Sequence, residues 1–217
     1  HNTAVGHQSM LHNTTAGFNT AIGKMALLNN TTAANNTAGG AYALFFNTTG
    51  AGNAALGRDA LYGNTDGSNN AGIGYQALYA NATGSGNTAL GASADVAAGN
   101  LTNATAIGAN ALAGASNSLV LGSVAGVNDA TSSVNVGIGT TTPAERLDVA
   151  GAIKIGNTTA PAPPAAGTIR WNDATQDFEG YTGTQWKSLT LQGGVIWGNK
   201  SSTENASVAA SDGAGHQ

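Results

Sequence analysis

Apolar and polar residues recur through the first 139 residues in units of 17. Each unit starts at an Asn, carries small and branched aliphatic residues, reaches a Gly four residues later, and then has a second apolar position and a second Asn. The starting residues are Asn2, Asn19, Asn36, Asn53, Asn70 and Asn87. Looser copies follow at 104–108, 118–122 and 135–139, with one spacing shortened to 14. These nine repeats predict a solenoid, in which each coil packs only against its neighbours.

Each unit is too short and too rich in Asn and Gly for an ordinary helix, whereas two strands of four or five residues and two turns fit within it. In the first strand, alternation places the branched residue on one face and Ala and Gly on the other. We interpret the branched face as the filled one and the Ala/Gly face as a bare surface against which neighbouring chains pack. The second apolar position is expected to complete the interior, and it comprises Met10, Leu27, Leu44, Leu61 and Leu78.

The repeated Gly and Asn positions suggest a specific backbone. Both residue types tolerate positive φ, so we expect such turns at the Gly and at both Asn positions. Stacked coils would also bring equivalent Asn side chains together, and their amides are predicted to form ladders along the solenoid axis.

The pattern changes after residue 139, where 12 of the 18 charged residues are found. Pro143 predicts a short helical turn over 144–149. Alternation over 168–171, 177–181 and 185–189 predicts a three-stranded meander. The expected divisions are a repeat domain (1–139), a neck (140–159), a Pro/Ala linker (160–166), a small β module (167–192) and an irregular tail (193–217).

Composition narrows the classes of function. Charged residues make up 8% of the chain and aromatic residues 6%, which does not favour the core and charged cluster of an enzyme. The net charge of −4 argues against a nucleic-acid partner, and no apolar run is long enough to insert into a membrane. Cys is absent, which excludes disulfides and thiolate sites. No phosphate-binding loop is recognisable, and we expect no cofactor.

Two groups of residues raise the question of metal or acid–base chemistry. His1, His7 and His12 lie close in sequence, and Asp173, Asp177 and Glu179 cluster near a predicted turn. The histidines lack a recognised ligand spacing, and the carboxylates lack the glycine-containing loop of a calcium site. We therefore interpret both groups as loop and turn residues and expect no metal site and no catalytic residue.

The segments 19–23 (Asn-Thr-Ala-Ile-Gly) and 87–91 (Asn-Thr-Ala-Leu-Gly) resemble the head repeats of trimeric autotransporter adhesins, over about residues 2–139. This resemblance implies an all-β fold: a left-handed parallel β-roll solenoid of about nine coils of 14–17 residues, assembled as a homotrimer. The family's usual coil is nearer the spacing of 14, so the coils of 17 imply longer turns. Residues 136–156 resemble the neck that follows such repeats in phage tail fibres, and 167–186 resemble a small β module near the ends of those fibres.

Side chains at variable repeat positions are candidates for contact with a receptor. They are Tyr42, Phe45, Phe46, Arg58, Tyr62, Tyr75 and Tyr79. Phe45, Tyr62 and Tyr79 share one repeat position and are predicted to stack into a stripe that could hold sugars or a protein. The alternative is that these rings fill the trimer interface or cover coil edges.

A second aromatic cluster is expected in the meander. Trp171, Phe178, Tyr181 and Trp186 form either the core of this small module or another receptor site.

Together these features predict a non-enzymatic homotrimeric fibre protein that attaches to a glycan or protein receptor on a cell surface. Such a protein would be extracellular, and the resemblance of residues 136–189 to fibre ends favours a phage tail fibre. The alternatives are a bacterial trimeric surface adhesin and a purely structural filament or spacer. A glycan depolymerase would require clustered carboxylates in a groove, which the sequence does not show.

Overall fold

The structure is a computed structural model that describes residues 1–153, 166–172, 174 and 177–189. The chain divides into two compact units, His1–Gly151 and Ala152–Gln217. All regular secondary structure among the described residues is β structure. None of these residues belongs to a helix that could span a lipid bilayer.

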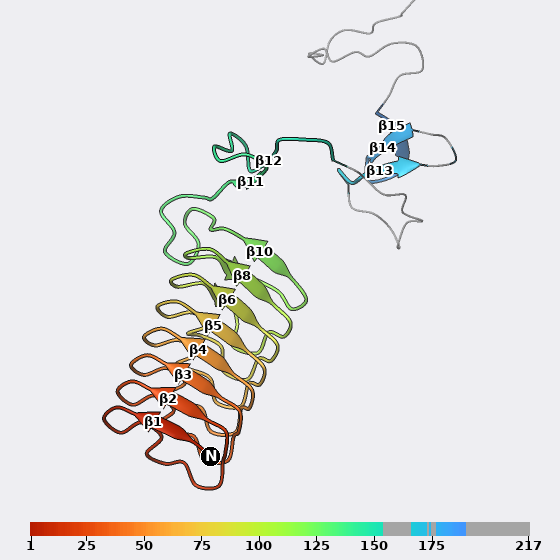
Figure 1. Cartoon of the computed structure of the whole chain (residues 1–217). Helices are drawn as coiled ribbons and strands as arrows, with labels where there is room; N and C mark the ends of the chain where they lie inside the picture. The colour runs from red at the N-terminus through yellow and green to blue at the C-terminus, as the bar shows by residue number, and fades with distance from the viewer. Residues whose placement is uncertain (154–165, 173, 175–176, 190–217) are drawn as a thin grey trace, which may run out of the picture. The chain divides into compact units, whose positions relative to one another are not determined.

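A parallel sheet of eight strands forms one wall of the first unit (Figure 1). In order, its strands are β1 (Thr3–Val5), β2 (Thr20–Ile22), β3 (Thr37–Gly39), β4 (Ala54–Leu56), β5 (Ala71–Ile73), β6 (Thr88–Leu90), β8 (Thr105–Ile107) and β10 (Leu119–Leu121). Each strand pairs with its equivalent in the next coil, for example Ala21 with Ala38. The expected parallel β-solenoid is therefore confirmed, with about seven turns.

The count of nine coils was too high because the last repeat does not join this sheet. Its strand β11 (Val136–Ile138) pairs in parallel with β12 (Leu147–Val149) in a separate sheet. The chain between β10 and β11 turns back toward earlier coils, where the Asn128 side chain donates to the carbonyl of Ser93. The sequence pattern of a strand therefore persists after the solenoid ends. The helical turn predicted for 144–149 was also wrong, because Leu147–Val149 is a strand with a partner.

The faces of the main sheet are the reverse of our interpretation. The central Ala residues point into the solenoid, and Ala21, Ala55 and Ala89 have no exposed surface. The branched residues point outward, so that 45% of Leu56 and 41% of Ile73 are exposed. The interior is narrow and the opposite wall already fills it with large side chains, so only small residues fit on the strand side.

The opposite wall supplies the Leu residues expected to complete the interior, and this prediction is confirmed. Leu27, Leu44, Leu61 and Leu78 have no exposed surface. In the first five coils this wall is a run of turns rather than the predicted second strand. A second strand is present only in the later coils, where β7 (Asp95–Val96) pairs with β9 (Leu112–Ala113).

The turns of this wall use positive φ at residues that the sequence did not indicate. Tyr42 has φ 62° and Leu44 has φ 52°, whereas the residue between them is not in this region. The N–H groups of these two residues point in opposite directions along the axis, because Tyr42 N–H donates to the carbonyl of Lys24 in the preceding coil and Leu44 N–H donates to the carbonyl of Ala60 in the next. The repeated Gly residues do have positive φ, but the two repeated Asn positions do not. That part of the prediction was wrong.

The predicted asparagine ladders are confirmed. In one column, the buried Asn64 amide nitrogen donates to Asn47 Oδ1 at 2.8 Å and to the carbonyl of Gly67 at 2.9 Å. Its oxygen accepts from Asn81 Nδ2 at 2.9 Å. In the other column, Asn53 Oδ1 accepts from the main-chain N–H of Asn70 at 2.9 Å. The side chains thus link each coil to the next.

The predicted three-stranded meander is confirmed in the second unit. Its strands β13 (Ile169–Asn172), β14 (Asp177–Tyr181) and β15 (Trp186–Ser188) pair antiparallel in chain order. The Pro/Ala linker, except for its last residue, and the whole of the tail predicted at 193–217 lie outside the described residues.

Candidate functional site

Three rings at one repeat position form the most regular surface feature of the solenoid. We call Phe45, Tyr62 and Tyr79 the aromatic stripe. The ring centroids of Phe45 and Tyr62 are 5.3 Å apart, and those of Tyr62 and Tyr79 are 5.2 Å apart, with planes inclined by only 10° and 2°. Phe46 lies beside the stripe and meets Tyr62 edge-on at 5.1 Å. The predicted stacking is confirmed.

The solenoid positions the stripe through the buried residue that precedes each ring. Leu44, Leu61 and Leu78 point inward, so the next residue of the chain points away from the core. Main-chain bonds fix the spacing between coils, because Gly63 N–H donates to the carbonyl of Tyr79 at 3.3 Å. The stripe therefore lies on the wall opposite the main sheet.

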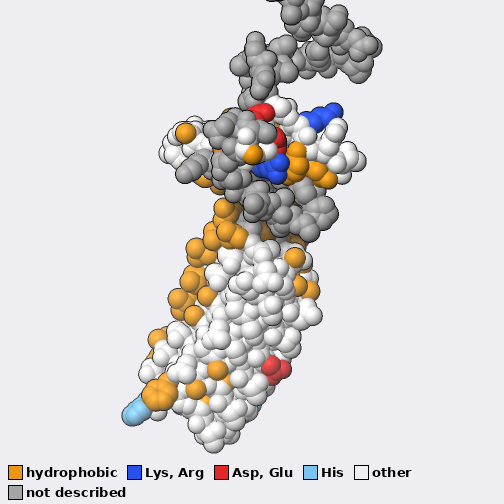
Figure 2. All heavy atoms as spheres, turned by 90° about the vertical axis from the view of Figure 1, so that its right-hand side faces the viewer, with side chains coloured by type: hydrophobic (Ala, Val, Ile, Leu, Met, Phe, Trp, Pro, Cys, Tyr) orange, Lys and Arg blue, Asp and Glu red, His pale blue; other side chains and the backbone are white. Residues whose placement is uncertain are grey.

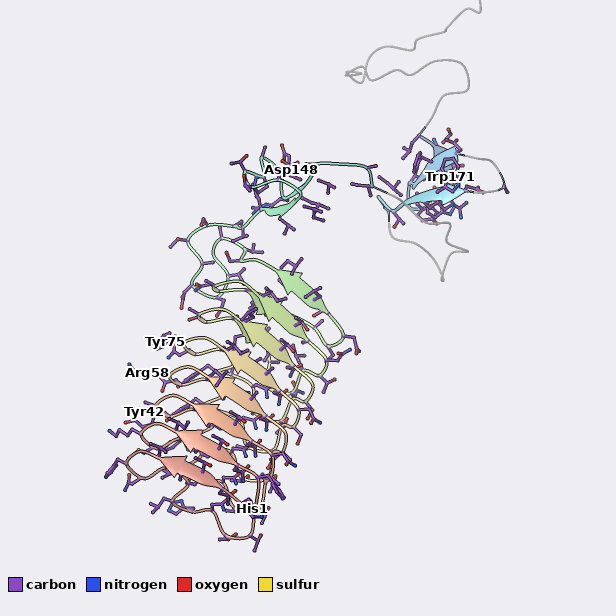
Figure 3. All side chains as sticks on the ribbon, in the orientation of Figure 1. His1, Tyr42, Arg58, Tyr75, Asp148 and Trp171 are labelled. Atoms are coloured by element: carbon purple, nitrogen blue, oxygen red, sulfur yellow. The ribbon has the colours of Figure 1, made fainter. Side chains whose placement is uncertain are left out.

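The other candidates of the first unit lie near the turns that follow the strands (Figure 3). Tyr42 has its ring centroid 5.9 Å from that of Phe45 and 5.4 Å from Lys24 Nζ, so it extends the aromatic group. Arg58 lies over the Tyr75 ring at 5.8 Å and forms an ion pair with Asp59. Arg58 and Tyr75 thus make a separate pair, away from the stacked rings.

In the meander, the predicted aromatic cluster divides into two pairs. Trp171 packs edge-on against Phe178 at 4.9 Å, and Tyr181 packs against Trp186 at 5.2 Å. Cross-strand register places these pairs on opposite faces, because side chains alternate along each strand.

The Tyr181–Trp186 pair is continuous with an ion pair. The guanidinium of Arg170 lies 4.0 Å from the centre of the Trp186 ring and donates two bonds to Glu179 Oε2, at 2.7 and 2.8 Å. Asn172 donates to the other oxygen of Glu179 at 2.9 Å. This carboxylate is therefore occupied in holding the strands together. Asp173 lies outside the described residues.

The histidines do not converge on a common point. His1 packs against the Phe18 ring at 5.9 Å, and His12 Nδ1 lies 3.1 Å from Asn29 Oδ1. In the described parts of the chain, no group of three or more His, Asp or Glu residues could hold a metal ion.

One ionisable residue escaped the sequence analysis. Asp95 stands one repeat after the core residue Leu78 and is itself buried. Its carboxylate accepts from the main-chain N–H of Ala80 at 3.0 Å and of Val96 at 2.8 Å. Burial raises the pKa of Asp95 to about 6, against the opposing effect of these two bonds. The signal that could have revealed it is an acid at a repeat position otherwise held by Met or Leu.

Replacement of Asp95 by Asn is expected to stabilise the protein above pH 6. Because the pKa of Asp95 is higher in the folded chain, this residue favours folding most below about pH 4, and its contribution to stability is lost as the pH rises through 6. Two pKa units correspond to about 3 kcal/mol, and the amide gives back part of this gain because it loses one accepted bond. We expect a net gain of about 1–2 kcal/mol at pH 8 and none at pH 4, measured by urea unfolding. A variant less stable than wild type at pH 8 would contradict this account.

The outer face of the main sheet is the second surface feature. We call its line of outward aliphatic residues the aliphatic rib: Val5, Ile22, Leu56, Ile73, Leu90, Ile107 and Leu121. Each is between 37% and 56% exposed. The residue two positions before each member of the rib also points outward, and it is Thr, Ala or Leu. This face therefore carries no charged side chain. Figure 2 shows the apolar side chains in a line along one side of the solenoid.

We compared the chain with known proteins at the level of family, sequence and structure. No protein-family model, no curated protein and no solved structure matches it.

Proposed function

We propose that this chain is part of a homotrimeric, non-enzymatic fibre that attaches to a receptor on a cell surface. The observation that carries the proposal is the separation of two uncharged outward surfaces, the aliphatic rib on one wall and the aromatic stripe on the other. One surface is suited to self-association, which leaves the other available for a ligand.

The aliphatic rib supports assembly of copies of this chain. Seven large apolar side chains lie in one row along this face, which only Gly39 of β3 interrupts, and together they exceed what a monomeric soluble protein usually exposes. The resemblance of the repeats to trimeric adhesin heads favours three copies, with the ribs turned toward a common axis. The face has no side chain that would leave a buried, unpaired charge there.

Replacement of Ile73 by Glu tests the assembly. Ile73 lies in the middle of the rib and is 41% exposed in the single chain, so a monomer should accept Glu. In a trimer, three carboxylates would be buried close together, and we expect dissociation to become at least about a hundredfold more favourable. Sedimentation should give three times 21.2 kDa for the wild type and a single chain for the variant.

Thr32→Glu provides the matched control, because Thr32 is exposed in a turn away from the rib. This variant should sediment like the wild type. A monomeric wild type, or a trimeric Ile73→Glu variant, would remove the basis for the assembly.

The aromatic stripe supports attachment. Large rings on a rigid scaffold supply contact area at low entropic cost, and they suit glycan or protein receptors. An extracellular location accords with this role. The resemblance of residues 136–156 and 167–186 to fibre ends favours a phage tail fibre over a bacterial surface adhesin.

Attachment is tested with fluorescently labelled protein and a panel of bacteria that carry different surface polysaccharides. We expect saturable binding to some strains, and enzymatic removal of the surface polysaccharide separates glycan from protein receptors. Absence of binding across the panel would favour a structural spacer.

A further inference from the structure

The three rings of the aromatic stripe do not offer equal surfaces to a ligand. Tyr62 is stacked between Phe45 and Tyr79, so both faces of its ring meet another ring. Tyr79 stacks on Tyr62 through one face only, and 41% of its surface is exposed. Phe45, at the other end, is less exposed and also meets the rings of Tyr42 and Phe46. A ligand that requires the face of a ring, rather than its edge, therefore finds it at the Tyr79 end.

The stripe ends here because the repeat changes in the next coil. The residue one repeat after Tyr79 is Val96, which is 2% exposed and belongs to β7. The change also appears in the main-chain bonds between coils. In earlier coils, N–H groups such as that of Phe46 donate to the carbonyl of the next coil, whereas Ala80 N–H donates to the Asp95 carboxylate. The next coil thus supplies no ring to cover Tyr79.

The residues around the Tyr79 end of the stripe are mostly small and uncharged. Ala80, Ala97 and Ala98 are exposed, and none of them is large enough to fill the place of a fourth ring. Asp95 is the only charged residue from 76 to 104, and it is buried against main-chain N–H groups. The cation that the described contacts place nearest in the repeat is Arg58, which lies over the Tyr75 ring and is paired with Asp59.

We infer that Tyr79 is the platform for one neutral pyranose ring of a surface glycan. The C–H groups on one side of a pyranose carry partial positive charge and pack on the electron-rich face of an aromatic ring. The inference rests on the attachment function proposed above and specifies its ligand class: a single sugar at the end of the stripe, not an extended chain that follows all three rings.

This inference is tested in two steps. The intact protein is first applied to an array of neutral and sialylated glycans, and it is then titrated with methyl pyranosides. Ligand-observed NMR should detect weak binding of a neutral pyranoside, and Tyr79→Ala should weaken it at least about tenfold. Tyr79→Trp retains a ring face and should bind at least as well as the wild type.

Phe18→Ala is the matched control, because Phe18 is an aromatic residue that is 67% exposed and packs on His1, outside the stripe. Unchanged binding in this variant, with loss in Tyr79→Ala, supports the platform. Glycan binding that survives Tyr79→Ala, or binding of sialylated glycans alone, overturns it. Cell attachment without glycan binding overturns the platform but leaves attachment intact, whereas failure to bind any cell counts against the attachment function itself.

Discussion

Replacement of Gly74 by Ala is expected to lower the free energy of unfolding by about 4 kcal/mol, because two penalties coincide at this position. Gly74 has φ 135°, a conformation that residues with a Cβ rarely adopt. The added Cβ would also lie 2.5 Å from the carbonyl oxygen of Gly91 in the next coil. That atom belongs to the main chain of the stacked coil and cannot move aside without disturbing the main sheet.

Two other Gly residues of the same unit separate these penalties. Gly114 has open space around it and no positive φ, so Gly114→Ala should change stability by less than about 0.5 kcal/mol. Gly126 has φ 79° but also open space, so Gly126→Ala should cost about 1 kcal/mol from backbone strain alone. Urea unfolding of all variants at one protein concentration gives the comparison. A Gly74→Ala variant no less stable than Gly126→Ala would show that the coils can move apart.

The repeat made the fold predictable, because a fixed period brings the same residue types together in every coil. Once coils stack in register, Asn64 must meet Asn47 and Asn81, and Tyr62 must meet its equivalents in both neighbouring coils. Both consequences followed from spacing alone, and both are present. Periodicity therefore specified which residues are neighbours along the axis.

Periodicity did not specify which side of a strand faces inward. The sequence places Ala55 and Leu56 next to each other, and hydrophobicity alone favours Leu56 as the buried one. The structure buries Ala55 because Leu61 from the opposite wall already occupies the narrow interior. This outcome depends on the distance between walls, which in turn depends on the positive φ values at residues such as Leu61.

Departures from the repeat were the least predictable features. The pattern at 135–139 looks like a ninth coil, yet its strand has another partner. Asp95, which the sequence analysis did not single out, replaces a core Leu, and Val96 beside it takes the place of the next ring of the aromatic stripe. The candidate platform at Tyr79 depends on this interruption, which the regular repeat positions do not predict.

Replacement of Asn64 by Asp is expected to cost about 4 kcal/mol or more at pH 8, although the two side chains have nearly the same shape. Asn64 has no exposed surface, and its amide nitrogen donates to Asn47 Oδ1 and to the carbonyl of Gly67. A carboxylate would lose both bonds and would bring a buried negative charge against two acceptor oxygens. The folded chain should therefore raise the pKa of the new carboxyl, so the loss should become smaller as the pH falls toward 4.

Asn69→Asp is the control for the charge alone, because Asn69 is exposed in a neighbouring turn and its φ of 58° is one that Asp tolerates. This variant should stay within about 0.5 kcal/mol of the wild type at both pH values, measured by urea unfolding. An Asn64→Asp variant that matched this control would contradict the ladder as a source of stability. A large loss at Asn64 that decreases on acidification would instead show that the stacking at this position depends on a neutral amide, which both donates to one neighbour and accepts from the other. Aspartate, which cannot donate when ionised, would then be excluded from this position by the stacking itself.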